Sequence, residues 1–225
     1  MIPITRVAWC FAACALIPYA HAGTISFTGN LRTDANFVDC GTGCTLGPAN
    51  TDGDYAQWAA VAFNFKVPVM SAMTAITFSY GGGTNGNGVT VLQGGFEPYL
   101  SLFDSNGNFL ASTFAGITCP AGSLANSVSG FCYDVGLDGG TLAPGTYQIA
   151  ISAFENMSFA ENPGGFLLAD GFTGLGNLAP GEDMHYGFDV SLAPMASTPE
   201  PGTAGLALAA VPAFYLLWKK RGKRK

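Results

Sequence analysis

Oxygen-bearing side chains alternate at one place in the sequence in a pattern that could hold a calcium ion. Asn50, Asp52 and Asp54 each carry a side-chain oxygen, and one residue separates each from the next. Calcium prefers such ligands, but this segment lacks the glycine and the glutamate of an EF-hand loop at their required positions. A plain turn built on the Asn and Asp side chains is the commoner arrangement, and a calcium site of another kind is the alternative.

A second group of candidate ligands surrounds His185, the single histidine after residue 22. Glu182, Asp183 and His185 could ligate a metal, although such a cluster is more often a solvated loop before a strand. No G-x-S-x-G turn is present for a Ser-His-Asp hydrolase. The sequence singles out no carboxylate pair for glycoside hydrolysis, because the separation of such a pair depends on the fold. We therefore assign no catalytic residue and expect no required cofactor.

Four cysteines follow residue 22, and an even number in an exported chain predicts two disulfide bonds. Sequence proximity favours Cys40–Cys44 and Cys119–Cys132 among the three ways of pairing them. The alternative is a zinc ion held by four thiolates, but the spacings do not match paired C-x-x-C motifs. The two predicted bonds would each close a short loop that has few apolar residues of its own.

The segments that would position these side chains contain aromatic and β-branched residues between Gly, Asn and Pro. No segment between the two ends has a helical period over three turns, which favours an all-β fold. Strands are expected at 24–29, 58–67, 73–80, 89–93, 99–103, 109–112, 142–152 (after an initial turn) and 186–192. The alternation would place Ile76, Phe78 and Tyr80 on one face, and residues 155–181 would be mostly loop with one short strand. About seven to nine short strands predict a single β-sandwich of Greek-key or jelly-roll type.

The beginning of the chain is typical of a secretory signal peptide. Arg6 supplies the positive charge, and the apolar run Val7–Ile17 is too short to span a membrane. Ala20-His21-Ala22 is a cleavage site with small residues at its first and third positions. We therefore expect residues 1–22 to be removed. A lipoprotein site at Cys14 is the weaker alternative.

The end of the chain has three successive parts: Pro199-Glu200-Pro201, the uncharged run Gly202–Trp218, and a cluster of six Lys and Arg residues. As a helix, the 17-residue run would measure about 25 Å, slightly less than a hydrocarbon core of about 30 Å. The basic cluster should stay in the cytoplasm by the positive-inside rule. These features predict a transmembrane helix that holds the preceding residues outside.

These three parts, in this order at the end of the chain, resemble the PEP-CTERM sorting signal of Gram-negative bacteria. The resemblance implies that the membrane enzyme exosortase recognises Pro199, Glu200 and Pro201, cuts near them, and releases or transfers the body to the cell surface or extracellular matrix. An ordinary single-pass anchor is the alternative, because composition and spacing indicate only an anchor. The resulting division is a signal peptide at 1–22, a secreted domain at 23–197 and a sorting signal at 198–225.

The body of the chain carries a second resemblance. Segments 80–110, 142–152 and 168–174 look like PEP-CTERM β-domains of the DVUA type. Segments 101–110 and 144–149 are also similar, more distantly, to the bacterial pre-peptidase C-terminal domain. Both resemblances imply an extracellular β-sandwich.

The charge of the secreted domain limits its partners. Residues 23–197 contain two basic side chains, Arg32 and Lys66, against fourteen acidic ones, which gives a net charge of −12. Such a surface repels nucleic acid and anionic lipid, so we expect no nucleic-acid partner. Divalent cations or basic partners are favoured instead.

The preferred functional hypothesis is a non-enzymatic surface or matrix protein that serves adhesion, biofilm formation or association with exopolysaccharide. It follows from the family resemblance, because exosortase systems accompany exopolysaccharide production. One alternative is a carbohydrate-binding module or carbohydrate-active enzyme on the same anchor. Trp58, Tyr99 and Tyr133 could then stack on sugars, although core packing is their more common role. Another alternative is a structural domain that calcium stabilises.

Overall fold

The computed structural model describes residues 22–38, 58–114, 116, 118–161 and 166–195. The chain divides into two compact units, residues 1–194 and 195–225, and every described helix and strand belongs to the first. The expected signal peptide, apart from its last residue Ala22, and the expected transmembrane helix lie outside the described residues. Among the helices that are described, none has the length and apolar character needed to cross a membrane.

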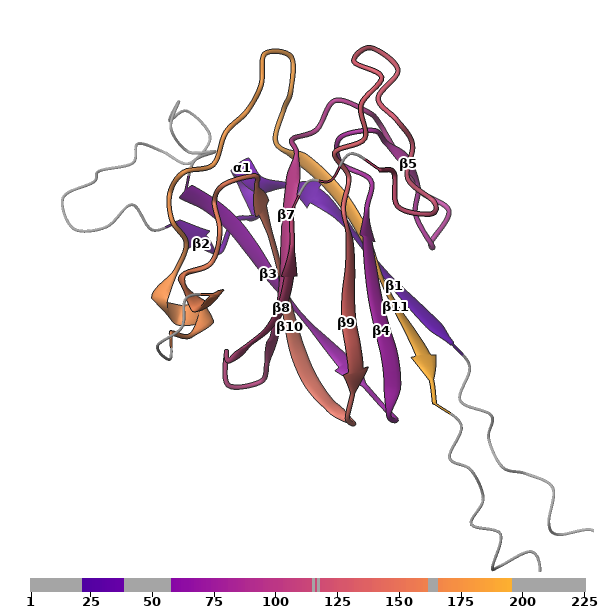
Figure 1. Ribbon diagram of the computed structural model, residues 1–225, viewed down its shortest axis with the longest axis vertical. Helices are drawn as coiled ribbons and strands as arrows, with labels where there is room; N and C mark the ends of the chain where they lie inside the picture. Colours follow the sequence, from indigo (N-terminus) through magenta and orange to yellow (C-terminus); the bar gives the residue numbers. More distant parts are fainter. Residues whose placement is uncertain (1–21, 39–57, 115, 117, 162–165, 196–225) are drawn as a thin grey trace, which may run out of the picture. The chain divides into compact units, whose positions relative to one another are not determined.

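Antiparallel sheets make up the first unit, which confirms the all-β prediction (Figure 1). One sheet has four strands in the order β1 (Gly23–Asn30), β11 (His185–Pro194), β4 (Ser71–Thr77) and β9 (Gly136–Leu142). A second has five strands in the order β2 (Phe37–Val38), β3 (Ala59–Val67), β10 (Gly145–Ala153), β7 (Pro98–Asp104) and β8 (Phe109–Thr113). A short hairpin pairs β5 (Gly83–Thr84) with β6 (Thr90–Val91).

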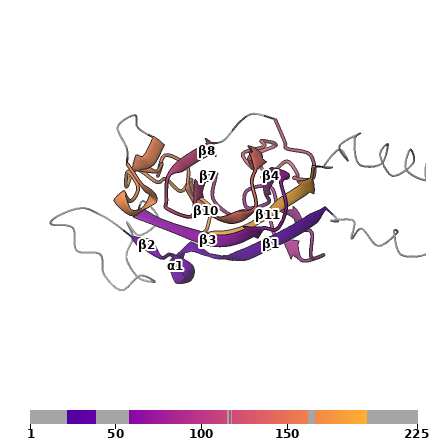
Figure 2. The same cartoon turned by 90° about the horizontal axis from the view of Figure 1, so that it is seen from below.

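The helical elements are short and lie at the margins of the sheets. Helix α1 (Leu31–Asp34) links β1 to β2, where Figure 2 shows it beside the strands that it connects. The side chain of Asn30 caps α1 by accepting a hydrogen bond from the backbone N–H of Arg32 at 2.9 Å. The 3-10 helices η1 (Phe159–Glu161) and η2 (Leu168–Asp170) occupy the predicted loop region. No strand forms there among the described residues, which differs from the expectation of one short strand.

The two larger sheets share one hydrophobic core. The ring of Phe27 on β1 lies 4.5 Å from that of Phe63 on β3 and 4.8 Å from that of Phe188 on β11, measured between centroids. Val61 and Ile149 of the second sheet are buried in the same cluster as residues of the first. Full burial of each such side chain contributes about 1.5–3 kcal/mol, so this interior holds the sheets together.

Strand β4 differs from its prediction. Its core-facing side chains are Met73 and Ala75, so Ile76 points to the opposite face, because side chains alternate along a strand. The strand ends at Thr77, and Phe78 and Tyr80 are buried beyond it rather than within the sheet. The expected common face of Ile76, Phe78 and Tyr80 is therefore wrong.

The two ends of the β1–β11 pair differ in the segments that lie there. Gly23, at the start of β1, pairs with Leu192 near the end of β11, so the chain enters and leaves the sheets side by side. At the opposite end of the same two strands, Asn30 pairs with His185. The loops around β5 gather at that second end (Figure 1). We call residues 78–97, 119–135 and 179–185 the loop end.

Candidate functional site

The buried carboxylate of Asp134 joins the loop end to strand β4 by hydrogen bonds. Asp134 is 1% exposed and accepts hydrogen bonds from Thr77 Oγ1 at 2.8 Å and from the backbone N–H groups of Tyr80 at 3.2 Å and Gly81 at 2.7 Å. Burial raises the pKa of Asp134, while these donors act in the opposite direction. Thr77 Oγ1 also accepts a hydrogen bond from Val135 N–H at 2.8 Å. These contacts explain why β4 ends at Thr77, since the chain turns there toward Asp134.

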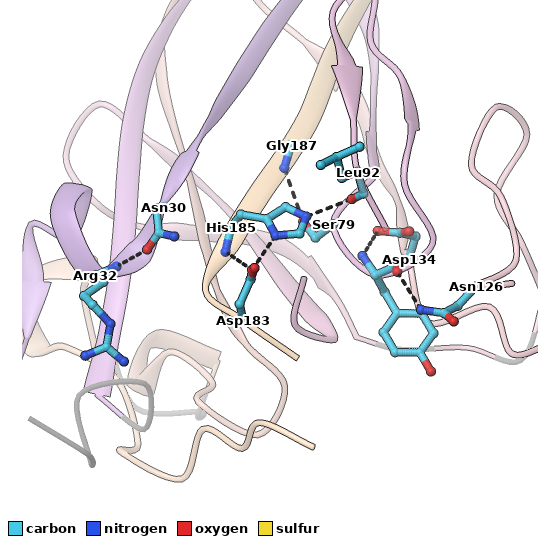
Figure 3. A network of polar contacts seen from close by, with 10 residues as sticks. Asn30, Arg32, Ser79, Leu92, Asn126, Asp134, Asp183, His185 and Gly187 are labelled. Carbon is cyan, nitrogen blue, oxygen red and sulfur yellow. Dashed lines mark hydrogen bonds and ion pairs between the residues drawn. The ribbon is translucent and has the colours of Figure 1, made fainter. Parts of the chain in front are cut away.

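The side chain of His185 also holds the loop end in place, through contacts of both ring nitrogens (Figure 3). Its Nε2 bonds the carbonyl oxygen of Leu92 at 2.8 Å, and its Nδ1 contacts the carboxylate of Asp183. Glu182 instead accepts a hydrogen bond from Ala179 N–H at 2.8 Å. In the described part of the chain no three His, Cys, Asp or Glu side chains form a group that could hold a metal ion. The structure thus gives these three candidate ligands structural contacts and does not bring them together as a metal site.

A cleft of about 490 Å³ opens at the loop end between the β5–β6 hairpin and the loop after Cys119. Glycine permits the close approach of these segments, because a Cβ on Gly81 would fall 1.7 Å from the carbonyl oxygen of Leu124. None of its lining side chains is an acid or a base. The lining residues are Gly81, Gly82, Gly83, Thr84, Thr90, Val91, Leu92, Gln93, Gly122 and Leu124.

Three aromatic rings form a ladder beside this cleft. Tyr80 is buried and contacts Tyr133 edge-on at 4.9 Å, and Tyr133 in turn stacks on Phe131 at 5.6 Å with 23° between the rings. Phe131 is 57% exposed, so the outer face of the ladder is open to solvent. The phenol oxygen of Tyr80 bonds Ser129 Oγ at 2.7 Å, which fixes the inner ring.

The predicted disulfide between Cys119 and Cys132 is confirmed, with Cα atoms 5.0 Å apart. It closes the loop that carries Phe131, so the exposed ring lies next to a covalent constraint. Because a cross-link restricts the unfolded chain, the bond stabilises a loop that has few buried apolar side chains.

Two half-buried carboxylates, Glu97 and Glu182, belong to two segments of the loop end. Gly95 pairs with Asp183, which brings the segments of Glu97 and Glu182 together. Burial, followed by the negative charge of Glu182, raises the pKa of Glu97, and burial also raises the pKa of Glu182. Burial and then the charges of Glu97, Tyr80 and Glu182 raise the pKa of the Tyr133 phenol.

Sequence reasoning missed this carboxylate pair, because its members are far apart along the chain. The local signal that could have found the ladder is the alternation of Phe131 and Tyr133 around Cys132.

The other aromatic candidates for sugar stacking have structural roles. Tyr99 is fully buried and donates a hydrogen bond to Glu161 Oε1 at 2.8 Å, and Ser112 Oγ donates to the same oxygen. These bonds fasten η1 to strands β7 and β8. The ring of Trp58 lies against Gly174, where a Cβ would come within 1.9 Å of it. Of the three candidates, Tyr99 is fully buried, whereas Trp58 and Tyr133 are half-buried, and Tyr133 stacks on the exposed ring of Phe131.

Several predicted site residues lie outside the described residues: Asn50, Asp52 and Asp54 of the calcium candidate, Cys40 and Cys44 of the first disulfide, and Pro199, Glu200 and Pro201 of the sorting motif. Those assignments stay predictions. The loop end is thus the part of the described structure that joins a cleft, exposed aromatic surface and half-buried carboxylates. No protein-family model, curated protein or solved structure matches this chain.

Proposed function

We propose that this chain is an exported, non-enzymatic protein of the cell surface or extracellular matrix that binds polysaccharide through its loop end. Exosortase would recognise Pro199-Glu200-Pro201 and process the chain after export. The observation that carries the proposal is the placement of the loop end, with its cleft and exposed aromatic ladder, opposite the end where Gly23 and Leu192 lie side by side.

The strand order supports a finer description of the fold as a jelly-roll sandwich. The first strand, β1, pairs with the last, β11, and β4 and β9 complete their sheet. Apart from the β7–β8 hairpin, consecutive long strands alternate between the two sheets. We therefore propose that the strands wind as an eight-stranded jelly roll, an architecture that includes lectin domains. Fold alone does not establish function, so this likeness supports sugar binding only together with the loop end.

The second candidate function is a carbohydrate-active enzyme on the same anchor. The pair Glu97 and Glu182 favours it, because glycosidases use two carboxylates with different pKa values. Burial raises the pKa of both groups here, and neither of them lines the cleft. Binding without turnover is therefore the preferred function.

Sorting can be tested in the host by the mass and location of the protein, with and without Pro199-Glu200-Pro201 changed to three alanines. We expect a wild-type mass that lacks the residues after the motif, in the extracellular fraction, and a full-length variant in the inner membrane. Full-length inner-membrane forms of both proteins would refute exosortase processing.

Binding and catalysis can be separated by a polysaccharide pull-down and a reducing-sugar release assay on the purified protein. We expect retention without sugar release. Release that Glu97→Gln abolishes would overturn the non-enzymatic proposal and establish the second candidate.

A further inference from the structure

Two of the three segments that form the loop end contain no ionisable acid or base. Residues 78–96 and 119–133 include no Asp, Glu, Lys, Arg or His. Of the acidic residues that follow them directly, Glu97 is half-buried and Asp134 is 1% exposed. The secreted domain as a whole has a net charge of −12, so its charges are concentrated elsewhere. We call residues 78–96 and 119–133 the neutral loops.

Hydrogen bonds join the two neutral loops into one surface. The side-chain oxygen of Gln93 accepts a hydrogen bond from Ser127 N–H at 2.9 Å, and the amide of Asn126 donates to the carbonyl oxygen of Tyr80 at 3.2 Å. The cleft of about 490 Å³ is lined by residues of both loops. Its volume lies within the range of about 300–1,000 Å³ that is usual for binding pockets.

The neutral loops expose apolar side chains beside hydrogen-bonding groups. Leu92 and Leu124 come from different loops, are 73% and 58% exposed, and both line the cleft. Thr84, Thr90 and Gln93 add hydroxyl and amide groups to the same lining. The exposed large apolar side chains of the two loops are Val89, Leu92, Leu124, Val128 and Phe131.

We infer that the neutral loops bind neutral polysaccharide, whose sugar units carry no carboxylate, sulfate or ammonium group. The inference rests on the proposed polysaccharide function and names its ligand class. A pyranose ring has an apolar C–H face and a rim of uncharged hydroxyl groups. The exposed leucines and Phe131 would contact the face, while the hydroxyl and amide groups of the lining would bond the rim.

Charged sugars fit this surface less well. A charge that leaves water loses affinity unless it meets a partner, and the neutral loops supply neither a carboxylate nor a cation. The net charge of the domain also repels polyuronates and sulfated glycans. The third segment of the loop end, 179–185, carries the ionisable residues Glu182, Asp183 and His185.

The basic residue Arg32 belongs to the surroundings of that third segment. It follows Leu31, whose backbone N–H donates to the carbonyl oxygen of Met184 at 2.9 Å, and it makes an interaction of its own. Segment 179–185 therefore has acidic and basic neighbours, whereas the cleft between the neutral loops is lined by uncharged residues alone.

The test is a titration of the purified, exported protein with neutral gluco-, manno- and galacto-oligosaccharides, and with polyuronate and glucosamine oligosaccharides of equal length. We expect a neutral series to bind at least about tenfold more tightly than both charged series. Its affinity should change by less than about twofold between low and high salt, because no ion pair forms. Phe131→Ala and the double variant Leu92→Ser/Leu124→Ser should each weaken this binding about tenfold.

Matched control variants separate the site from general effects. Phe114 is 57% exposed, the same as Phe131, so Phe114→Ala removes an equally exposed ring outside the loop end. Leu175 is 63% exposed and also lies outside the loop end, so Leu175→Ser is the control for the leucines. Both controls should bind like the wild type, and unfolding curves should show that every variant is folded.

The outcomes of the titration separate this inference from the proposed function. Charged oligosaccharides that bind as tightly as the neutral ones, or a leucine double variant that binds like the wild type, would overturn the inference and leave polysaccharide binding intact. Binding to none of the oligosaccharides would also overturn the inference, and failure of the pull-down as well would overturn the proposed function. Equal weakening by Phe114→Ala and Phe131→Ala would refute the assignment of the site.

Discussion

Replacing Asp134 with asparagine should destabilise the loop end without changing the volume of the side chain. One carboxylate oxygen accepts from Thr77 Oγ1 and Tyr80 N–H, and the other accepts from Gly81 N–H. An amide has one acceptor oxygen, so its NH₂ group must face donors on one of the two sides. In either orientation, at least one buried N–H loses its acceptor.

The size of the effect follows from these contacts. Leaving a buried donor without a partner costs about 1–3 kcal/mol, and removing a buried charge offsets part of this cost. We therefore expect the Asp134→Asn variant to lose about 2 kcal/mol in free energy of unfolding. For a domain of this length, that loss corresponds to a melting temperature about 4–8 °C lower.

The effect should also depend on pH. Burial raises the pKa of Asp134 above its ordinary value of 3.8, so the folded state holds this proton more tightly than the unfolded state. The wild type therefore loses stability as pH rises through the folded pKa of Asp134, and a variant that cannot titrate lacks this loss. The advantage of the wild type over Asp134→Asn should be larger in acid than at neutral pH.

Thermal and urea unfolding of the two proteins across a pH series would measure both quantities. Asp138→Asn is a suitable control, because Asp138 is exposed and accepts a hydrogen bond from Gly140 N–H at 2.9 Å. The control should change the free energy of unfolding by less than about 1 kcal/mol. A variant at Asp134 that is as stable as this control, or curves that run parallel at all pH values, would refute the assigned role of Asp134.

Three further predictions concern single features of the domain. Replacing Cys119 and Cys132 with serine should lower the free energy of unfolding by about 3 kcal/mol, because the bond closes a loop with a sequence separation of 13. Wild-type melting that is insensitive to reductant would contradict this prediction. Glu155 has a φ of 70°, so Glu155→Gly should stabilise the domain by up to about 1 kcal/mol in urea unfolding, and equal stabilisation by Glu155→Gln would exclude backbone strain as the cause. Burial, followed by contacts with acidic side chains, raises the pKa of Tyr99 and Tyr186 above the ordinary value of 10.0. The free energy of unfolding should therefore fall as pH rises past that value, and Tyr99→Phe should reduce this fall in alkaline melting experiments.

The sequence predicted the strands best where large side chains alternate. Strands β3 and β10 were expected almost at their observed bounds, because large side chains alternate along both. In the sheet, Val61, Phe63 and Phe65 of β3 pair with Ile151, Ile149 and Tyr147 of β10. Burial of one face leaves such a pattern in the sequence, and hydrophobic periodicity detects it.

Strand β9 was missed because its sequence, Gly136–Leu142, contains adjacent glycines that are typical of turns. The structure gives these glycines two different physical roles. A Cβ on Gly139 would lie 2.4 Å from the sulfur of Met73, so this glycine makes room for a core side chain. Gly140 has a φ of 66°, near the point where the β4–β9 register shifts. Neither role can be read from composition, because both depend on the neighbouring strand.

The loop end shows a similar limit. The Cys119–Cys132 bond could be predicted, since proximity in sequence favours short loops. The pairing of Gly95 with Asp183, which joins the segments that carry Glu97 and Glu182, could not be predicted. Long-range pairing of this kind leaves no local pattern in a single sequence.

The buried polar contacts at the loop end hold an exposed aromatic face in place. Asp134 and Asn126 are both buried, and a buried polar group destabilises the fold unless all its partners are supplied. The core between the sheets needs neither residue, because its aromatic and aliphatic side chains pack without them. What the two residues do hold is Tyr80, through its backbone N–H and its carbonyl oxygen, and Tyr80 supports the exposed ladder. Rigid support of an exposed face lowers the entropy lost on binding, so these contacts are compatible with the recognition that we propose for the loop end, in addition to their contribution to stability.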